Sequence, residues 1–567
     1  MLARAVLVGI VAIHVVFLVW TPYLNHDAAA YVSAAQLLLR GGRPGIEIVD
    51  TNPPMIIYLT ALPVIVAGWL HVSASASVLL FFFGAIAVGG VLFVRALRVA
   101  RPIEPGTADL VLALWFLLSL RIYWSMGMLR VGGDFGQRDQ LIFAWLAPFV
   151  VLRAARYLDR RVPVGLASVI AILAAVAIAM KPFFVVPVCG CELLFALSFK
   201  RVRTVLAAPD WWVVVIGQAV FLLHFVVVPG GSAFLTRWLP QIVRGYSAYG
   251  SPIGVVLQGA THGPRAYVWA IALVVLCSHP LWRRSRESVL PGGFGWFAAL
   301  SLLLYMVEAK GWSYQLWPYY GALLMGSALL VVETLGDRTA GAARGACVVC
   351  VCGALVVLTL PAPPRPSLLA RRLAAPPFSF PMNGVAAVIE ALSAPDDRIL
   401  MLSTSVLDSY PALTYTGRLP ASRFVSAAFP LAFFFSGSRD YEVPAAWRQE
   451  EAQFYAALVD DARAWSPRLA FVHDGPGQAL PAGFRVTRYL ERRGFFESAL
   501  SAYVPVGRVA DFLVYLRGDG PARSECAACD GLAPATRAVI DQLRHRGVLA
   551  ALSPLPAAAG RVPNGPG

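Results

Sequence analysis

The chain has 567 residues, of which 58% are hydrophobic and only 14% are charged. Soluble domains carry about 25% charged residues, so this composition indicates an integral membrane protein. The formal net charge of +15 does not point to nucleic acid as a partner, because the basic residues form short clusters between apolar runs and no nucleic-acid-binding motif accompanies them.

Apolar runs, taken in chain order, predict a membrane bundle of about 11 to 13 helices, since a straight span needs about 20 residues. The first run follows Arg4 and has no small-x-small cleavage site after it, which favours a membrane helix over a signal peptide. The run 55–70 fits strict alternation of the spans only if it is a partial or re-entrant helix, or if the linker 71–76 lies elsewhere. The runs are residues 5–20, 55–70, 77–94, 106–123, 141–152, 163–179, 182–197, 211–228, 265–282, 291–307, 318–333 and 346–360.

The distribution of Lys and Arg predicts the orientation of these spans, because cytoplasmic loops carry an excess of basic residues. We expect the N-terminus inside and the C-terminus outside. The loops 21–54, 124–140 and 229–264, with the turns at Lys181 and Lys310, then face outward. The basic residues assigned to the cytoplasm are Arg95, Arg98, Arg101, Arg153, Arg156, Arg160, Arg161, Lys200, Arg201, Arg203, Arg283, Arg284, Arg286, Arg338 and Arg344.

The character of the chain changes after residue 360. We expect residues 1–360 to form the membrane domain, residues 361–380 a stiff Pro-rich linker, residues 381–552 a mixed α/β domain on the outer face, and residues 553–567 a disordered tail. Strands are predicted at 399–402, 469–472 and 512–516, and a helix at 450–464. The predicted fold class is an all-α polytopic membrane bundle followed by a small soluble α/β domain.

The eight cysteines divide into two groups. Six lie in apolar runs, where Cys behaves as a small hydrophobic residue. Cys526 and Cys529 form a C-x-x-C pair in the outer domain, for which a local disulfide is favoured over zinc because no second ligand pair is evident. A thioredoxin-like redox role lacks the surrounding βαβ pattern, and we predict no metal site.

The loop after the first apolar helix carries the most informative polar residues. An acid at the mouth of a membrane helix is costly to place and usually marks function, which draws attention to Asp27. If this segment is helical, Asp27 and Tyr31 share a face. In the alternative interpretation Asp27 only caps a short interfacial helix that begins at Ala28. His26 is expected to be a solvated loop residue or a hydrogen-bond partner rather than a metal ligand.

Three further polar segments lie on the same predicted face. The loop 132–140 places Gln137, Arg138 and Asp139 before an apolar run, where Asp139 could instead be a helix cap. Its glycine spacing is not that of a phosphate-binding loop. Lys181 is a lone cation among nearly uncharged residues, and snorkelling to the interface is the alternative. The segment 308–320 combines Lys310 with Trp and Tyr residues, including Tyr314, that also suit an interfacial aromatic belt.

Taken together, these segments put two acids and three cations beside aromatic side chains at one membrane face. This mixture suits chemistry on an anionic lipid donor that enters from the bilayer. Cations hold the donor phosphate as it leaves, and a carboxylate takes a proton from an acceptor hydroxyl. Aromatic side chains offer apolar faces to a sugar ring.

The first loop resembles that of the GT-C glycosyltransferases, in the branch of the protein O-mannosyltransferases and the aminoarabinose transferase of lipid A. Arg138-Asp139 resembles the family's second acid, Lys181-Pro182 resembles a lysine that touches the donor phosphate, and 310–314 resembles a late loop of bacterial members. The residues of the first loop that carry the resemblance are 26–31, Ala35, Leu38, Gly41, Gly42, Pro44, Asp50, Pro53 and Pro54.

The resemblance implies a multi-span glycosyltransferase of the bacterial inner membrane that uses a polyprenyl-phosphate sugar and inverts the anomeric carbon. The lipid-linked sugar phosphate is then the co-substrate, and no cofactor or metal is needed. We see no MIR-type repeats like those of the protein-mannosylating branch, so a glycan or lipid acceptor of the envelope is favoured over a protein.

On this interpretation Asp27 is the general base, and Asp139 positions the acceptor or orients Asp27. The donor phosphate is expected to contact Arg138, Lys181 and Lys310. The residues expected to line the substrate site are His26, Tyr31, Asp50, Gln137 and Tyr314.

Two other classes of protein remain as alternatives. A transporter or flippase of a lipid-linked or anionic substrate would place ionisable groups near the membrane midplane and often shows paired repeats. Here the groups cluster at one face and no repeat is evident. A non-catalytic scaffold would make the carboxylate of the first loop dispensable and leaves that long loop without a purpose.

Overall fold

The computed structural model describes residues 2–20, 24–125, 135–200, 203, 207–248, 250–261, 265–282, 289–334, 383–425, 430–435, 438, 441–476, 480–481, 483–518 and 532–551. Several predictions fall outside these ranges: the run 346–360, the linker, the C-x-x-C pair, the tail, part of the loop 124–140, and the basic residues from Arg283 to Arg286 and at Arg338 and Arg344. The chain divides into two compact units, residues 1–46 with 50–379 and residues 47–49 with 380–567.

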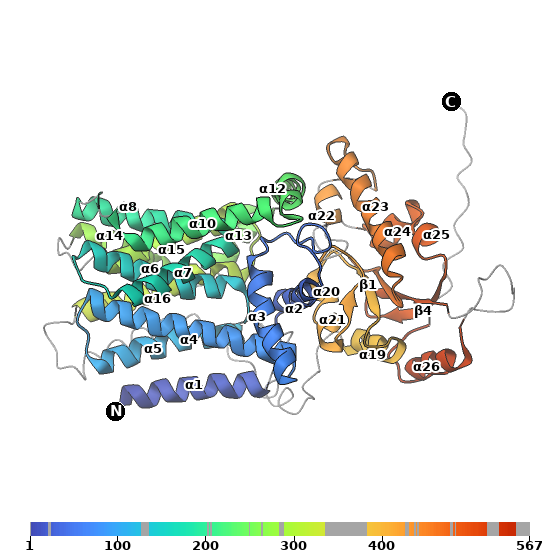
Figure 1. The fold of residues 1–567 in the computed structure, drawn as a ribbon, viewed down its shortest axis with the longest axis horizontal. Helices are drawn as coiled ribbons and strands as arrows, with labels where there is room; N and C mark the ends of the chain where they lie inside the picture. The colour runs from blue at the N-terminus through green and yellow to red at the C-terminus, as the bar shows by residue number, and fades with distance from the viewer. Residues whose placement is uncertain are drawn as a thin grey trace. The chain divides into compact units, whose positions relative to one another are not determined.

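Unit 1 is a bundle of long helices that lie nearly side by side (Figure 1). Within the described ranges, five helical segments are long and apolar enough to cross a membrane: Ala74–Ala100, Pro182–Phe199, Pro209–Val227, Val289–Glu308 and Ser313–Thr334. The long helices are α1 (Leu2–Trp20), α4 (Ala74–Ala100), α5 (Pro105–Ser125), α6 (Arg138–Tyr157), α7 (Val164–Met180), α8 (Val185–Phe199), α10 (Pro209–Val227), α14 (Arg265–Trp282), α15 (Val289–Glu308) and α16 (Trp317–Thr334). The predicted fold class of an all-α membrane bundle is confirmed.

Helix α6 lies inside the bundle and is buried along almost its whole length. It packs closely on α4, because Gly89 has no side chain and a Cβ there would lie 2.4 Å from the carbonyl oxygen of Ala144. The indole nitrogen of Trp145 also donates to the carbonyl of Ala85 across 3.3 Å. A helix surrounded by protein need not be uniformly apolar, so α6 can carry charged residues near both of its ends.

The helix over the run 55–70, α3 (Met55–Leu70), does not lie along the bundle. It runs across the direction of the long helices at one end of unit 1 (Figure 1). This geometry agrees with the expectation of a partial helix. The same end carries α2 (His26–Leu39) and the short helices between α10 and α14, namely α11 (Gly231–Ala233), the π-helix η2 (Phe234–Trp238), α12 (Leu239–Ala248) and α13 (Ile253–Thr261). Two short 3-10 helices, η1 (Pro182–Phe184) and η4 (Ser313–Leu316), precede α8 and α16.

Toward the other end of unit 1, charged side chains of α6, α8 and α10 form a buried network. Arg153 donates to both oxygens of Glu192 and, across 2.7 Å, to Asp210. Arg156 donates to Asp210 across 3.1 Å, and the Tyr157 hydroxyl donates to Glu192 across 3.0 Å. Arg153 is only 2% exposed, so it is a buried ion-pair partner rather than the loop residue that its basic cluster suggests.

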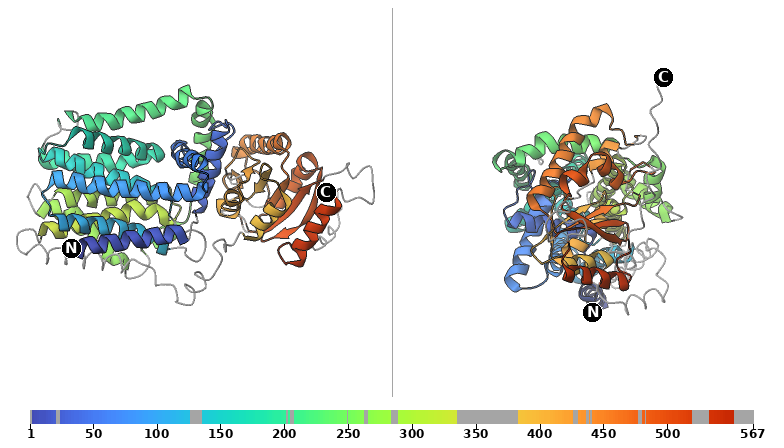
Figure 2. Two further views of the ribbon diagram at one scale, coloured as in Figure 1. Left: turned by 60° about the horizontal axis from the view of Figure 1, so that its bottom comes forward. Right: turned by 90° about the vertical axis from the view of Figure 1, so that its right-hand side faces the viewer.

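Unit 2 is a mixed α/β domain with a five-stranded sheet in the order β2-β1-β3-β5-β4. Figure 2 shows this sheet with helices packed around it. β1 pairs in parallel with β2 and β3, while β5 is antiparallel to β3 and β4. The strands are β1 (Arg398–Leu402), β2 (Leu419–Pro420), β3 (Leu469–His473), β4 (Tyr503–Val509) and β5 (Phe512–Arg517). The structure contains the three strands expected from sequence, and β2 and β4 are additional.

The helices of unit 2 include the one predicted at 450–464, which is α23 (Arg448–Trp465). Val49, from the loop after α2, forms a parallel bridge with Phe424 and so belongs to this unit. The other helices are α19 (Asn383–Leu392), α20 (Val406–Ser409), α21 (Ala412–Thr416), α22 (Pro430–Phe435), η5 (Ala445–Trp447), α24 (Val486–Arg492), α25 (Phe495–Ala499) and α26 (Pro534–His545).

Candidate functional site

The N-terminus of α2 presents the carboxylate of Asp27. The N-cap of α2 is Asn25, whose side-chain oxygen accepts a hydrogen bond from the backbone nitrogen of Asp27 across 2.8 Å. The interpretation of Asp27 as the cap of a helix beginning at Ala28 is therefore wrong. Because Asn25 supplies the cap, the Asp27 carboxylate remains available for other contacts.

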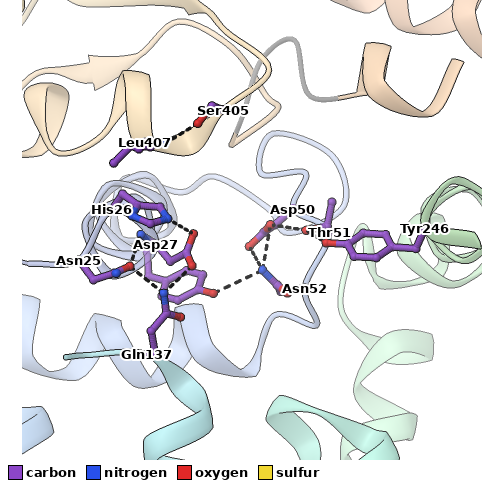
Figure 3. Close-up of polar contacts among 11 residues, drawn as sticks. Asn25, His26, Asp27, Asp50, Thr51, Asn52, Gln137, Tyr246, Ser405 and Leu407 are labelled. Atoms are coloured by element: carbon purple, nitrogen blue, oxygen red, sulfur yellow. Dashed lines mark hydrogen bonds and ion pairs between the residues drawn. The ribbon is translucent and has the colours of Figure 1, made fainter. Parts of the chain in front are cut away.

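Among the described residues, Gln137 and His26 contact the Asp27 carboxylate (Figure 3). The Gln137 amide donates to Oδ2 across 2.6 Å and to the cap oxygen of Asn25 across 2.8 Å. Nε2 of His26 lies 3.6 Å from Oδ1, and the side chains of His26 and Asp27 are 29% and 20% exposed. Gln137 thus links α2 to the start of α6 and orients the carboxylate.

Tyr31 and Asp50 meet through Asn52. The Asn52 amide donates to both oxygens of Asp50 across 3.3 Å and contacts the Tyr31 hydroxyl at 3.4 Å. Burial raises the pKa of Asp50 above its usual value, while the Arg138 guanidinium opposes the rise. Burial also raises the pKa of Tyr31, so its hydroxyl keeps its proton at neutral pH.

A second carboxylate, Asp139, lies within the first turn of α6 and does not cap that helix. The N-cap is Gln137, which makes no side-chain cap hydrogen bond. Asp139 is fully buried, and its Oδ1 accepts from the Lys181 ammonium across 2.7 Å. Lys181 also lies 3.6 Å from Glu308 and is only 3% exposed, so it does not snorkel to an interface.

The other two predicted cations differ from Lys181. Nη1 of Arg138 is buried and has no hydrogen-bond partner. Lys310 donates to the carbonyl of Tyr246 across 2.9 Å and lies 4.4 Å from the centre of its ring. Burial lowers the pKa of Lys310 from 10.5 to about 8, although the Glu308 carboxylate opposes this shift.

Electrostatic interactions tie these groups into one cluster at one end of unit 1. The charges of Arg138, Asp27, Asp50 and Asp139 all act on the Tyr31 hydroxyl. Those of Asp27, Asp139 and Arg138 also act on Tyr314. Glu308 interacts with Lys181, Asp139, Arg138 and Lys310. The structure thus brings all ten predicted site residues together: His26, Asp27, Tyr31, Asp50, Gln137, Arg138, Asp139, Lys181, Lys310 and Tyr314.

Sequence reasoning missed Asn25, Asn52, Tyr246, Glu308 and Gln315 as members of this cluster. Glu308 carries a usable signal, because an acid at the end of an apolar helix is costly unless it is paired. The amides and Tyr246 carry none, since such residues are common in loops. The described ranges contain no group of three or more His, Cys, Asp or Glu side chains placed to hold a metal ion.

No family model and no curated protein matches the chain. Its fold matches that of ArnT from Cupriavidus metallidurans, whose crystal structure contains undecaprenyl phosphate. The match covers 91% of this chain and 99% of that one, with a TM-score of 0.54 and 14% sequence identity. The chain therefore has a GT-C-like fold over both units, as its first loop suggests.

Proposed function

We propose that this chain is an integral-membrane glycosyltransferase that transfers a sugar from a polyprenyl-phosphate-linked donor to a lipid or glycan acceptor of the bacterial envelope. One observation carries the proposal. A partly exposed carboxylate, Asp27, and a buried guanidinium with an unpartnered nitrogen, Arg138, lie in one cluster of a fold shared with ArnT. The undecaprenyl phosphate in the ArnT crystal supports a donor of that lipid class.

Asp27 is a better general base than Asp139. Asp139 is fully buried and its Oδ1 is held by Lys181, so an acceptor hydroxyl has little access to it. Asp27 accepts from the neutral amide of Gln137 and forms no ion pair with a Lys or Arg among the described residues. Its exposed fraction also leaves room for an acceptor hydroxyl to approach.

In the proposed reaction, Asp27 takes the proton of the acceptor hydroxyl as its oxygen attacks the anomeric carbon. The bond between that carbon and the phosphate oxygen breaks, and the polyprenyl phosphate leaves with the bonding electron pair. Attack from the face opposite the leaving group inverts the anomeric carbon. The lipid-linked sugar phosphate is the co-substrate, and no cofactor takes part.

The leaving phosphate is assigned first to Arg138 and then to Lys310. Arg138 has an unpartnered N–H donor, and an Arg–phosphate contact is among the strong charge-assisted hydrogen bonds. Lys310 carries a positive charge with three ammonium donors, and it contacts the Tyr246 carbonyl. Lys181 is held by two carboxylates, so we assign it to the support of Asp139 rather than to the phosphate.

Substitution of the base tests the proposal most directly. Full-length protein would be assayed with undecaprenyl-phosphate-linked sugars and an envelope lipid extract. Asp27→Asn keeps the size of the side chain and removes its basicity, so turnover is expected to fall about 10²–10⁴-fold. Asp541→Asn is the matched control, because Asp541 is exposed on α26 and pairs only with Arg544 three residues later.

Wild-type turnover in a folded Asp27→Asn protein would remove Asp27 as the base. Vesicles that contain the protein distinguish the transporter interpretation. If labelled donor crosses the membrane and no glycosylated product forms with any sugar, the protein is a flippase and not a transferase.

A further inference from the structure

Three buried side chains and the partly exposed Glu308 form a continuous chain of polar contacts next to Arg138. Asp139 binds Lys181, Lys181 lies 3.6 Å from Glu308, and Glu308 accepts a hydrogen bond from the Gln315 amide. They come from the start of α6, the end of α7, the end of α15 and the start of η4–α16. Of these four, only Asp139 and Lys181 are predicted from sequence as site residues, although Glu308 and Gln315 lie in the segment 308–320.

Both ends of this chain are hydrogen-bond acceptors without a partner. Oδ2 of Asp139 and Oε1 of Gln315 are buried and unpaired, in residues that are 0% and 6% exposed. The Gln315 amide nitrogen faces Glu308 and donates to its carboxylate. The amide oxygen therefore points away from Glu308. Leaving a buried acceptor unpaired costs about 1–3 kcal/mol.

Because both unpaired atoms are acceptors, a ligand that binds here must offer hydrogen-bond donors. Phosphate oxygens are acceptors, so a phosphate could not pair with them and would be repelled by Asp139 and Glu308. A glycosyl ring offers hydroxyl donors. Arg138 has the complementary unpaired donor at Nη1, and its charge interacts with that of Asp139, so a phosphate held by Arg138 would bring its attached ring near Asp139.

Resting on the proposed function, we infer that Asp139 and Gln315 form the subsite that recognises hydroxyl groups of the donor's glycosyl ring. Lys181 and Glu308 are positioning residues in this subsite. Lys181 holds Oδ1 of Asp139 so that Oδ2 faces the ring, and Glu308 fixes the amide of Gln315. Gln315 is then a determinant of sugar specificity, while Asp27 and Arg138 carry proton transfer and phosphate binding.

Binding measurements on full-length protein in nanodiscs test this assignment. The probes are undecaprenyl phosphate alone and undecaprenyl phosphate carrying glucose, mannose, galactose or arabinose. The sugar with the largest gain in affinity over the bare lipid is then used. Gln315→Met keeps the side-chain length and removes the acceptor. It is expected to reduce that gain about 5- to 100-fold, and to leave the affinity for undecaprenyl phosphate within about 2-fold of wild type.

The matched control is Gln218→Met on α10, where the amide contacts only the Ala175 carbonyl. It is expected to preserve the sugar-dependent gain. A second measurement needs no variant: on wild-type protein, at least one monodeoxy analogue of the preferred donor should bind about 5-fold or more weakly.

The outcomes separate the two proposals. Three results would overturn the sugar subsite and leave the glycosyltransferase proposal standing. Gln315→Met could lose the same affinity for the bare and the glycosylated lipid, or lose no affinity at all. The wild-type protein could also bind every deoxy analogue as tightly as the preferred donor. Failure of the wild-type protein to bind undecaprenyl phosphate overturns the proposed function and this inference with it.

Discussion

At the scale of single residues, the start of α2 divides two tasks between neighbouring side chains. Asn25 satisfies the helix backbone, so the carboxylate of Asp27 is left to Gln137 and His26. If residue 25 were itself the acid, its carboxylate would accept from the helix backbone as the cap and would be less available for other contacts. The capping role that was the alternative interpretation of Asp27 therefore falls to a residue two positions earlier.

Lys310 gives the site a dependence on pH that can be measured. Burial lowers the pKa of Lys310 to about 8, so its ammonium is charged at pH 7 and loses its proton as the pH rises through about 8. Affinity for undecaprenyl phosphate is therefore expected to fall about 10-fold or more between pH 7 and pH 9.5, a range in which the phosphate, with a second pKa of about 6, gains little further charge. Titration of wild-type protein with undecaprenyl phosphate at a series of pH values measures this effect.

Two variants serve as controls for this pH dependence. Lys310→Arg stays charged throughout the range and should bind at pH 9.5 nearly as at pH 7. Lys310→Met should bind weakly at both values. A wild-type affinity that does not change over this range would exclude a role for Lys310 in phosphate binding.

The site residues that could be predicted from sequence are charged residues next to an apolar run, because the free-energy cost of that placement can be recognised from the neighbouring residues alone. Asp27, Arg138 and Lys181 stand out because charge beside an apolar run needs a reason. Glu308 and Gln315 belong to the same cluster through contacts that link residues far apart in the chain, such as Glu308 with Lys181. Nothing in the spacing of the sequence encodes those contacts.

At the scale of elements, α6 connects the two ends of unit 1. Its first turn carries Arg138 and Asp139, and its last turns carry Arg153 and Arg156. The last pair binds Glu192 and Asp210, so α6 is anchored to α8 and α10 at the end away from the site. These ion pairs hold α6 in place, and α6 carries Arg138 and Asp139, which we assign to the phosphate and the sugar.

Removal of Arg153 is expected to destabilise the bundle strongly. Arg153→Met leaves the buried carboxylate of Glu192 without a cation and Asp210 with Arg156 alone, and breaking a buried pair costs about 3–5 kcal/mol. Thermal unfolding in detergent should show a clear loss relative to wild type. Arg160→Met, at an exposed position just past the same helix, should unfold like wild type. An unchanged melting temperature in Arg153→Met would show that the network contributes no net stability.

Apolar patterning predicts most long helices but not their direction. The run 55–70 is as apolar as a span, yet α3 lies across the bundle. Hydropathy shows only that a segment is apolar. Apolar side chains are removed from water both in a helix that crosses the lipid and in one that packs on the end of the bundle, so hydropathy does not distinguish the two. The two-residue strand β2 is too short to leave a pattern.

At the scale of the whole molecule, unit 1 has two chemically distinct ends. The proposed site lies at the end where α6 begins, and the buried Arg153 network lies toward the end where it finishes. The basic clusters predicted to be cytoplasmic include residues just past the second end, such as Arg160 and Arg161. The proposed site would then face the outside of the cell.

Cysteine labelling tests this orientation. Ser73→Cys lies in the turn before α4, at the site end, and Arg160→Cys follows α6 at the other end; both positions are exposed. A membrane-impermeant maleimide added to intact spheroplasts is expected to label Ser73→Cys above the parent protein and to label Arg160→Cys only after lysis. The reverse pattern would place the site in the cytoplasm.

The bridge between Val49 and Phe424 makes unit 2 discontinuous along the chain. The backbone nitrogen of Val49 donates to the carbonyl of Arg423 across 2.6 Å, and Val425 donates back to Val49 across 3.0 Å. A chimaera that exchanged only residues 380–567 with a relative would therefore graft an incomplete domain, because the strip at 47–49 would remain that of the host. The second unit is therefore built from two separate stretches of the chain, and a substitution that disturbs the backbone at 47–49 would be felt at residues 423–425, far along the sequence.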